Sequence, residues 1–421
     1  MTPPDTDGAG GRPAGGWRRL LAALLLGCAS GLPLALSGAT LQAWLTTEGA
    51  SLKSIAWFSL VGLPYTWKFV WSPFLDRYAP PAFGRRRGWM MVLQVALAAL
   101  LAAMAFTAVP ADLPRLAALA IGVAFLSASQ DIVIDAWRTE VLHPAERGLG
   151  AAFAVLGYRL GMLVTGALAL VAAQAWGWRD VFLALAGLFL LLPLVSLWAP
   201  ESDQAPVCAP ADLRSAVIEP LREFLQRDGA WAMLALVVAY KLSDAFAMAL
   251  STTFLLRGAG FSLAEVGLVN KGVALVATLA GAVLGGAGLA RLGLLRALLT
   301  FGALQSLAAL GFFLLSVQGH VLWLMVLAVT LENLTSGMGT AAFAALLMAL
   351  CDRRFSATQF ALLSALAAFG RVYVGPASGW LAANLGWPVF FVFSIVMGLP
   401  GLLLVWWQRA RVARLDEESV A

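Results

Sequence analysis

The sequence predicts an all-α membrane protein with twelve transmembrane helices, and three observations support this prediction. Of the 421 residues, 61% are hydrophobic and 12% are charged, whereas soluble domains carry about 25% charged residues. Apolar stretches of about 20 residues, the length that a helix needs to cross hydrocarbon, recur along the chain. These stretches are continuous rather than alternating, which favours helices over a β-barrel.

The apolar stretches divide the chain into two halves of six predicted spans. The first half covers residues 17–200 and the second covers 230–408, separated by a linker at 201–229 in which a short surface helix is expected around 213–226. Residues 1–16 are predicted to be a disordered tail and 409–421 a second tail. The predicted spans are 20–45, 53–75, 88–109, 114–138, 148–174, 180–199, 230–256, 263–289, 297–317, 321–350, 357–382 and 387–407.

The distribution of Lys and Arg predicts the orientation in the membrane. Both termini and alternate loops carry 18 of these residues, whereas the opposite loops carry 4, namely Lys53, Arg115, Arg179 and Arg257. Cytoplasmic loops are enriched in Lys and Arg, so both termini are predicted to be cytoplasmic. No cleavable signal peptide is evident, and the expected location is the bacterial inner membrane.

An internal repeat indicates that the halves are pseudo-symmetric. The segment PAERGLGAAFAVLGYR, which ends at Arg159, aligns without gaps to SATQFALLSALAAFGR, which ends at Arg371, at an offset of 212 residues. Two further pairs of segments, beginning at residues 51 and 262 and at residues 177 and 386, repeat at offsets of 211 and 209. Duplicated six-span halves in one orientation are the build of major facilitator transporters, in which substrates bind at mid-membrane between the halves.

Ionisable residues inside the predicted spans are the main candidates for a functional site. Each costs about 2.5–3.5 kcal/mol at a helix centre, so such groups mark substrate and ion pathways by default. Six bases and four acids give an excess of positive charge that predicts an anionic substrate. The ten residues are Lys68, Asp131, Asp135, Arg138, Arg159, Lys241, Asp244, Lys271, Glu332 and Arg371.

The fourth predicted span carries the densest group of polar residues. Asp131, Asp135 and Arg138 fall on one helical face, with Gln130 adjacent. Two carboxylates one turn apart repel each other, which favours a role in proton coupling. Alternatively, Arg138 neutralises Asp135 in a structural ion pair.

The remaining candidates each have a structural alternative. Lys241 and Asp244 are spaced to form a local pair, and Lys68 is long enough to reach the membrane interface. Arg159 and Arg371 occupy equivalent places and are either ligands or gate and packing residues. Glu332 is a third proton-coupling candidate. Further candidate substrate contacts are Gln42, Asn333 and Trp44, and the Trp44 ring is suited either to stacking on a sugar or to core packing.

Several other classes of protein are excluded or disfavoured. The cysteines, at positions 28, 208 and 351, are too far apart for a metal or redox motif. The arginines lie between spans rather than on one soluble face, so a nucleic-acid partner is not expected. There is no phosphate-binding glycine loop and no nucleophile triad. The chain is therefore expected not to be an enzyme and to need no cofactor or metal.

Several segments resemble the muropeptide permeases (AmpG family) of Gram-negative bacteria. These are SGLPLALSGATLQAWL, SLVGLPYTWKFVWSPFLDRY, GRRRGWM, SQDIVIDAWRTEVL, ERGLGAAFAVLGYRLGMLVTGALAL and WGWRDVF in the first half, and chiefly YKLSDAFAMALSTTFLL with GFSLAEVGLVNKG in the second. The resemblance implies a major facilitator fold and proton-linked import of GlcNAc-1,6-anhydromuramyl peptides by a monomer in contact with membrane lipid. In some bacteria this flux also feeds β-lactamase induction.

The superfamily's loop signature after the second span predicts a cytoplasmic gate at Asp76, Arg77 and Arg85. Ser72 stands where a glycine is usual, and the second half has lost the equivalent acid. Two alternatives to muropeptide import remain. One is a porter for another bulky anion, such as a CoA thioester or an oligosaccharide, and the other is a non-transporting membrane sensor.

Overall fold

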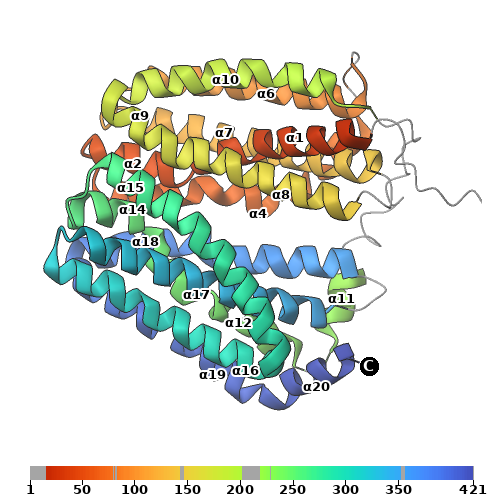
Figure 1. The fold of residues 1–421 in the computed structure, drawn as a ribbon, viewed down its shortest axis with the longest axis vertical. Helices are drawn as coiled ribbons and strands as arrows, with labels where there is room; N and C mark the ends of the chain where they lie inside the picture. Colours follow the sequence, from red (N-terminus) through yellow and green to blue (C-terminus); the bar gives the residue numbers. More distant parts are fainter. Residues whose placement is uncertain are drawn as a thin grey trace, which may run out of the picture.

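The computed structural model describes residues 16–78, 80, 83–142, 147–201, 219–227, 229–351 and 356–420, and these residues form helices and no strand. Figure 1 shows two helical bundles side by side, the first from the N-terminal half and the second from the C-terminal half. The fold class predicted from the sequence is thus confirmed.

The first bundle contains ten α-helices and three short helical segments of other types. The α-helices are α1 (Gly16–Leu36), α2 (Ala39–Thr47), α3 (Leu52–Trp57), α4 (Leu63–Trp67), α5 (Ser72–Arg77), α6 (Arg85–Ala105), α7 (Leu113–Val141), α8 (Arg147–Leu163), α9 (Ala169–Trp176) and α10 (Trp178–Trp198). The other segments are the 3₁₀-helices η1 (Phe58–Gly62) and η2 (Lys68–Val70) and the π-helix η4 (Val164–Leu168).

The second bundle is built in the same way. Its α-helices are α12 (Ala230–Tyr240), α13 (Leu242–Ala249), α14 (Ser251–Thr253), α15 (Leu263–Gly267), α16 (Ala274–Gln318), α17 (Leu322–Ala349), α18 (Ser356–Val396), α19 (Leu399–Trp407) and α20 (Arg409–Val420). The π-helices are η6 (Phe254–Gly258) and η7 (Leu268–Val273). Helix α11 (Glu219–Leu225) lies where the linker helix was expected, and α20 occupies the predicted C-terminal tail. Residues 1–15 and 202–218 lie outside the described residues.

Nine segments of the described chain are long and apolar enough to cross a membrane. Helices α16 and α18 each reverse direction at a glycine with a positive φ angle, 72° at Gly293 and 79° at Gly386, so each contains two of the predicted spans. The predicted span at 53–75 is broken into the short helices α3 to α5, because Pro64 lacks an amide hydrogen and starts a new helix. The count of twelve spans stays a prediction.

Closely packed glycines bring neighbouring helices together inside each bundle. A Cβ atom on Gly157 of α8 would lie 1.9 Å from the carbonyl oxygen of Leu24, and one on Gly161 would lie 2.3 Å from that of Cys28. In the second bundle a Cβ atom on Gly281 would lie 2.1 Å from the carbonyl oxygen of Leu334. These small residues let helix backbones approach closely within a membrane.

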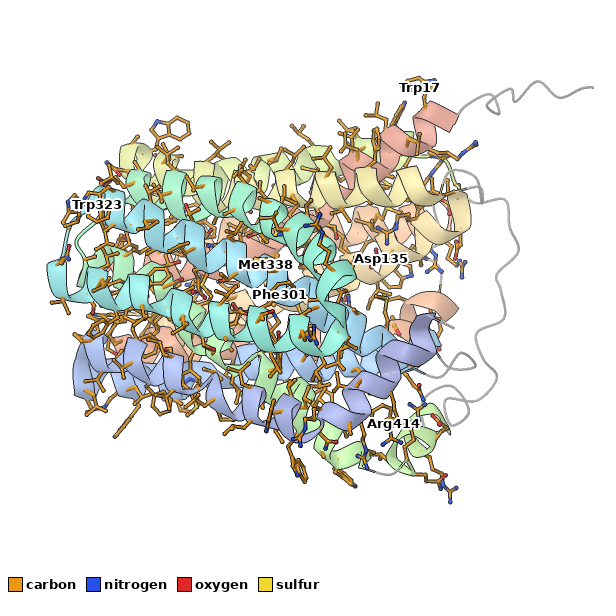
Figure 2. The ribbon with its side chains drawn as sticks, turned by 60° about the horizontal axis from the view of Figure 1, so that its bottom comes forward. Trp17, Asp135, Phe301, Trp323, Met338 and Arg414 are labelled. Carbon is orange, nitrogen blue, oxygen red and sulfur yellow. The ribbon has the colours of Figure 1, made fainter. Side chains whose placement is uncertain are left out.

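The outer surface of the bundles suits contact with lipid. Large apolar side chains are exposed along the helices, among them Leu190, Leu194 and Val283, and so broad an apolar surface is typical of membrane interaction. Figure 2 shows Trp17 and Trp323 toward opposite ends of the molecule, and both are about two-thirds exposed at 68% and 65%. Tryptophan is enriched at both membrane interfaces. The start of α1 and the C-terminus lie at the same end of the molecule (Figure 1).

Candidate functional site

Helices α1 and α7 and the segment η2 converge on Asp131 in the first bundle. Asp131 is 9% exposed, and the Ser30 hydroxyl of α1 donates a hydrogen bond to its carboxylate. Lys68 of η2 interacts with this carboxylate electrostatically. The adjacent Gln130 is fully buried and donates to the carbonyl oxygen of Ala29 at 2.7 Å. Asp131 is therefore a buried acid with a polar partner and a nearby base, whereas Gln130 joins two helices.

Asp135, one turn further along α7, has different surroundings. Its carboxylate lies 3.0 Å from the Arg138 guanidinium, and the two side chains are 56% and 29% exposed. Figure 2 shows Asp135 toward the end of the molecule that also carries Arg414. The structural ion pair considered as an alternative is thus present. Arg159 of α8 is only partly buried.

A second group of polar residues lies in the other bundle around the break between α12 and α13. Lys241 Nζ lies 3.7 Å from Asp244 Oδ2 and donates to the Thr340 hydroxyl at 3.0 Å. The Ser336 hydroxyl donates to Asp244 Oδ1 at 3.2 Å. Lys241 and Asp244 therefore form the local pair that their spacing predicts, and α17 supplies hydroxyl partners to both.

Two buried side chains of the second bundle, each with two polar atoms, have no hydrogen-bond partner for either atom among the described residues. Glu332 is 1% exposed, and neither of its carboxylate oxygens has a partner, although it interacts electrostatically with Asp244 and Lys241. The neighbouring Asn333 donates to the carbonyl oxygen of Val329 at 2.8 Å. Burying a polar group without a partner is costly, so Glu332 stands out as a group kept for function.

Asn270 is the second such residue, and the sequence analysis did not select it. It lies in the π-helix η7, is 3% exposed, and neither of its amide atoms has a partner in the described structure. An amide inside an apolar span was the available signal. π-Helical turns are frequent at functional sites.

Gln42 and Trp44 occupy different positions from those expected of a substrate site. Gln42 Nε2 donates to the carbonyl oxygen of Ala249 in the opposite bundle at 2.6 Å. Trp44 is 4% exposed and packs in the core, with ring centroids 4.6 Å from Phe182 and 6.2 Å from Trp178. Of its two predicted roles, Trp44 has the one in core packing.

At the end of the first bundle that carries the chain terminus, the predicted gate residue Arg85 binds within its own bundle. Its Nη2 lies 2.8 Å from Glu140 Oε1, and the buried Arg86 lies 2.6 Å from the same oxygen. Arg87 lies 3.4 Å from Glu201. Glu140 was missed as a partner because its distance along the sequence from Arg85 gave no signal. The side chains of Asp76, Arg77, Lys271 and Arg371 lie outside the described residues, and their backbones belong to α5, η7 and α18.

The site thus consists of a base and an acid in each half, Lys68 with Asp131 and Lys241 with Asp244, and of the additional acid Glu332. Such groups can bind a charged solute and can exchange protons with it or with water. The described residues contain no cluster of three or more His, Cys, Asp or Glu side chains that could hold a metal ion.

Comparison with known proteins identifies the family. Residues 20–373 match the Major Facilitator Superfamily. The chain is 55% identical over 384 residues to the anhydromuropeptide permease of Escherichia coli (strain K12), covering 91% of this chain and 78% of that protein. It is 32% identical over 403 residues to the putative transporter AmpG 4 of Rickettsia conorii, covering 94% and 97%.

Solved structures agree with this fold. A bacterial homologue of the human lysosomal transporter Spinster superposes with a TM-score of 0.70 at 16% identity, covering 97% of this chain and 99% of that chain. The D-xylose–proton symporter superposes with a TM-score of 0.68 at 16% identity, covering 93% and 97%. Permeases of this superfamily are not enzymes. The chain belongs to the Major Facilitator Superfamily and, within it, to the AmpG family of muropeptide permeases.

Proposed function

We propose that this permease imports GlcNAc-1,6-anhydromuramyl peptides across the bacterial inner membrane by alternating access, driven by protons that enter with the cargo. The relationship to the anhydromuropeptide permease of E. coli, at 55% identity over 91% of this chain, carries the proposal. The aligned residues cover both halves of the chain and therefore the helices that face each other between the halves.

The chemistry of the site supports an anionic cargo. Anhydromuropeptides combine a sugar with peptide carboxylates, and Lys68 and Lys241 place an ammonium group in each half near the break of a span. Arg138 and Arg159 add guanidinium groups that suit bidentate binding of carboxylate. Lys271, Arg371 and Asn333 complete the set of proposed substrate contacts.

Proton coupling is assigned to one acid of each half, Asp131 and Glu332, whereas Asp135, the third candidate from the sequence, is assigned to its exposed ion pair with Arg138. Asp131 is buried beside a base, so binding of cargo or movement of Lys68 changes the cost of its charge. Glu332 is buried with no hydrogen-bond partner for its carboxylate among the described residues. Loading a proton from one side and releasing it to the other is the role expected of such groups in a transporter that alternates between two open states.

Uptake by the purified protein in proteoliposomes tests this proposal. A radiolabelled anhydromuropeptide should accumulate when an inward proton gradient is imposed and should only equilibrate when the gradient is collapsed with a protonophore. Accumulation that is the same with and without the gradient would show that transport is not coupled to protons. Absence of uptake under both conditions, from protein that is monodisperse and folded, would remove the cargo.

A further inference from the structure

A row of hydrogen bonds joins the two bundles at the end of the molecule remote from the termini. Gln42 Nε2 donates to the carbonyl oxygen of Ala249 at 2.6 Å. One turn further along, the hydroxyl oxygens of Thr46 and Thr253 lie 3.0 Å apart. Both partners advance by four residues from one bond to the next, so two helical segments run side by side in register. Figure 1 shows α2, which carries Gln42 and Thr46, close to α14, which carries Thr253. Ala249 is the last residue of α13.

Arg257, four residues after Thr253, closes this row. Its Nη1 donates to the carbonyl oxygen of Ala50 at 2.6 Å, its Nε donates to that of Thr46 at 2.9 Å, and its Nη2 also donates to Thr46. The last carbonyls of a helix lack intrahelical partners and form the negative end of its dipole. One guanidinium from the second half therefore clamps the C-terminal end of α2 in the first half.

In the predicted orientation, the row lies at the outer ends of two spans. Segment α2 continues the first predicted span and η6 ends the seventh, and these two spans are equivalent in the repeat. Arg257 also lines a pocket of about 610 Å³ whose walls come from both halves, including Thr47, Gln174 and Leu263. The Arg257 end of the row is exposed, whereas Thr46 and Thr253 are buried, with exposed fractions of 3% and 0%.

The polar contacts at the opposite end have a different arrangement. There Arg85 and Arg86 bind Glu140 within the first half, and Arg227 binds Glu223 at 2.7 Å within the linker. The described hydrogen bonds between halves therefore hold one end closed.

We infer that Arg257 is a transport residue, the terminal clamp of a latch formed with Gln42, Thr46 and Thr253 that must open for cargo to load from the outer side. This inference rests on the proposed alternating transport. The clamp joins a side chain to backbone carbonyls, so its strength does not depend on a titrating partner. Loss of the guanidinium shifts the molecule toward the state that is open outward, because the bonds exist only in the closed state.

Labelling of a single cysteine tests the latch without any substrate. The native cysteines are replaced (Cys28→Ala, Cys208→Ser, Cys351→Ser). Ala249→Cys then places a reporter thiol at the residue whose carbonyl oxygen accepts the bond from Gln42. A charged, membrane-impermeant maleimide is added to intact cells. Arg257→Ala should raise the labelling rate about tenfold, because hydrogen bonds from a charged donor change an equilibrium by at least that factor. The labelling rate of Arg257→Lys should lie between those of the parent and of Arg257→Ala, since an ammonium group lacks the planar fork of donors that binds two carbonyls.

The matched control is Arg115→Ala, which removes an exposed arginine whose ion pair with Asp112, at 4.0 Å, stays within its own half. This variant should label at the parental rate. Equal labelling of the Arg257→Ala protein and its parent, or an equal increase in the control, would overturn the latch. Thr253→Val removes the bond between Thr46 and Thr253 without adding volume. This variant gives the same test if Arg257→Ala is poorly folded.

A reversible cross-link tests the same latch through transport. Thr46→Cys with Thr253→Cys, in the cysteine-free background, puts two thiols where hydroxyl oxygens are 3.0 Å apart. Oxidation should stop both uptake and exchange of anhydromuropeptide, and dithiothreitol should restore them, which also shows that the variant is folded. Full transport by the oxidised protein would overturn the inference. If neither the reduced variant nor its parent transports, the proposed function fails, and the labelling contrast still decides whether the latch exists.

Discussion

Asp131 and Asp135 are neighbouring acids with very different environments. They are one turn apart on α7 and belong to one face of that helix. Asp131 is buried and held by the Ser30 hydroxyl, whereas Asp135 is 56% exposed and paired with Arg138. A partly exposed ion pair with both members on one helix stabilises the structure little. Asp131 is accordingly the stronger candidate for proton coupling.

We expect Asp131→Asn to abolish accumulation driven by a proton gradient, because an amide keeps the shape and the bond from Ser30 but does not gain or lose a proton near neutral pH. Exchange of labelled cargo across the membrane without a gradient should continue, which separates coupling from folding and binding. Asp135→Asn serves as the matched variant and should keep most of the accumulation. Uptake and exchange in proteoliposomes measure both quantities. Parental accumulation by Asp131→Asn would exclude this acid from coupling.

The sequence singled out candidate site residues but did not predict their environment. Charged groups in apolar spans are rare, so Asp131, Lys241 and Glu332 stood out by composition alone. Which of them are paired depends on helices distant in sequence, such as the contact of Ser30 with Asp131, and spacing gives no information on that. Asn270 was missed because an amide inside a span is less conspicuous than a charge.

At the scale of elements, glycine spacing predicted close packing but not its partners. The spacing of Gly157 and Gly161, and of Gly281, Gly285 and Gly286, within predicted spans predicts close helix contacts. The structure confirms this for Gly157 and Gly161, with α1 as the neighbour. The same expectation at Gly286 was wrong, since nothing lies within 4 Å of a Cβ atom built there. Four-residue spacing defines a helical face, and the fold decides whether another helix meets it.

We expect Gly157→Ala to destabilise the first bundle by about 1–3 kcal/mol, the usual cost of forcing extra volume into a packed core. The new Cβ atom would lie 1.9 Å from the carbonyl oxygen of Leu24, and backbone atoms cannot rotate away as a side chain can. Unfolding of the detergent-solubilised protein, followed by loss of the monodisperse peak after heating, should begin several degrees lower.

Gly187→Ala in α10 is the control for this substitution, because nothing lies within 4 Å of its Cβ position. Alanine is favoured over glycine in a helix interior by about 1 kcal/mol, so this variant should unfold at the parental temperature or above it. A similar loss of stability in both variants would show that the α1–α8 contact is not as tight as the backbone distances indicate.

At the scale of the whole molecule, the chain repeats its scaffold but only some of its charges: Arg159 has a counterpart in Arg371, whereas Asp131 has none. The repeat predicted two matched bundles, and two such bundles are present (Figure 1). An offset of 211 residues places Ala342 opposite Asp131, so the acid of the first half has no counterpart in the second. Duplicated apolar patterning is enough to predict the fold, whereas the candidate site differs between the halves, so the surroundings of its residues had to be taken from the structure.

Recognition of the cargo's charge is proposed to involve both halves of the permease. Lys68 and Lys241 come from different bundles, so an anion between them is attracted from both sides. We expect an anhydromuropeptide with amidated peptide carboxylates to compete at least about tenfold less well than the free acid for exchange in proteoliposomes, since charged hydrogen bonds are lost. Lys68→Gln should narrow this difference, whereas Lys53→Gln, at an exposed lysine at the outer end of α3, should leave it unchanged. Equal competition by the amidated and the free cargo in the parent protein would show that the charges serve protons or structure and do not recognise the cargo.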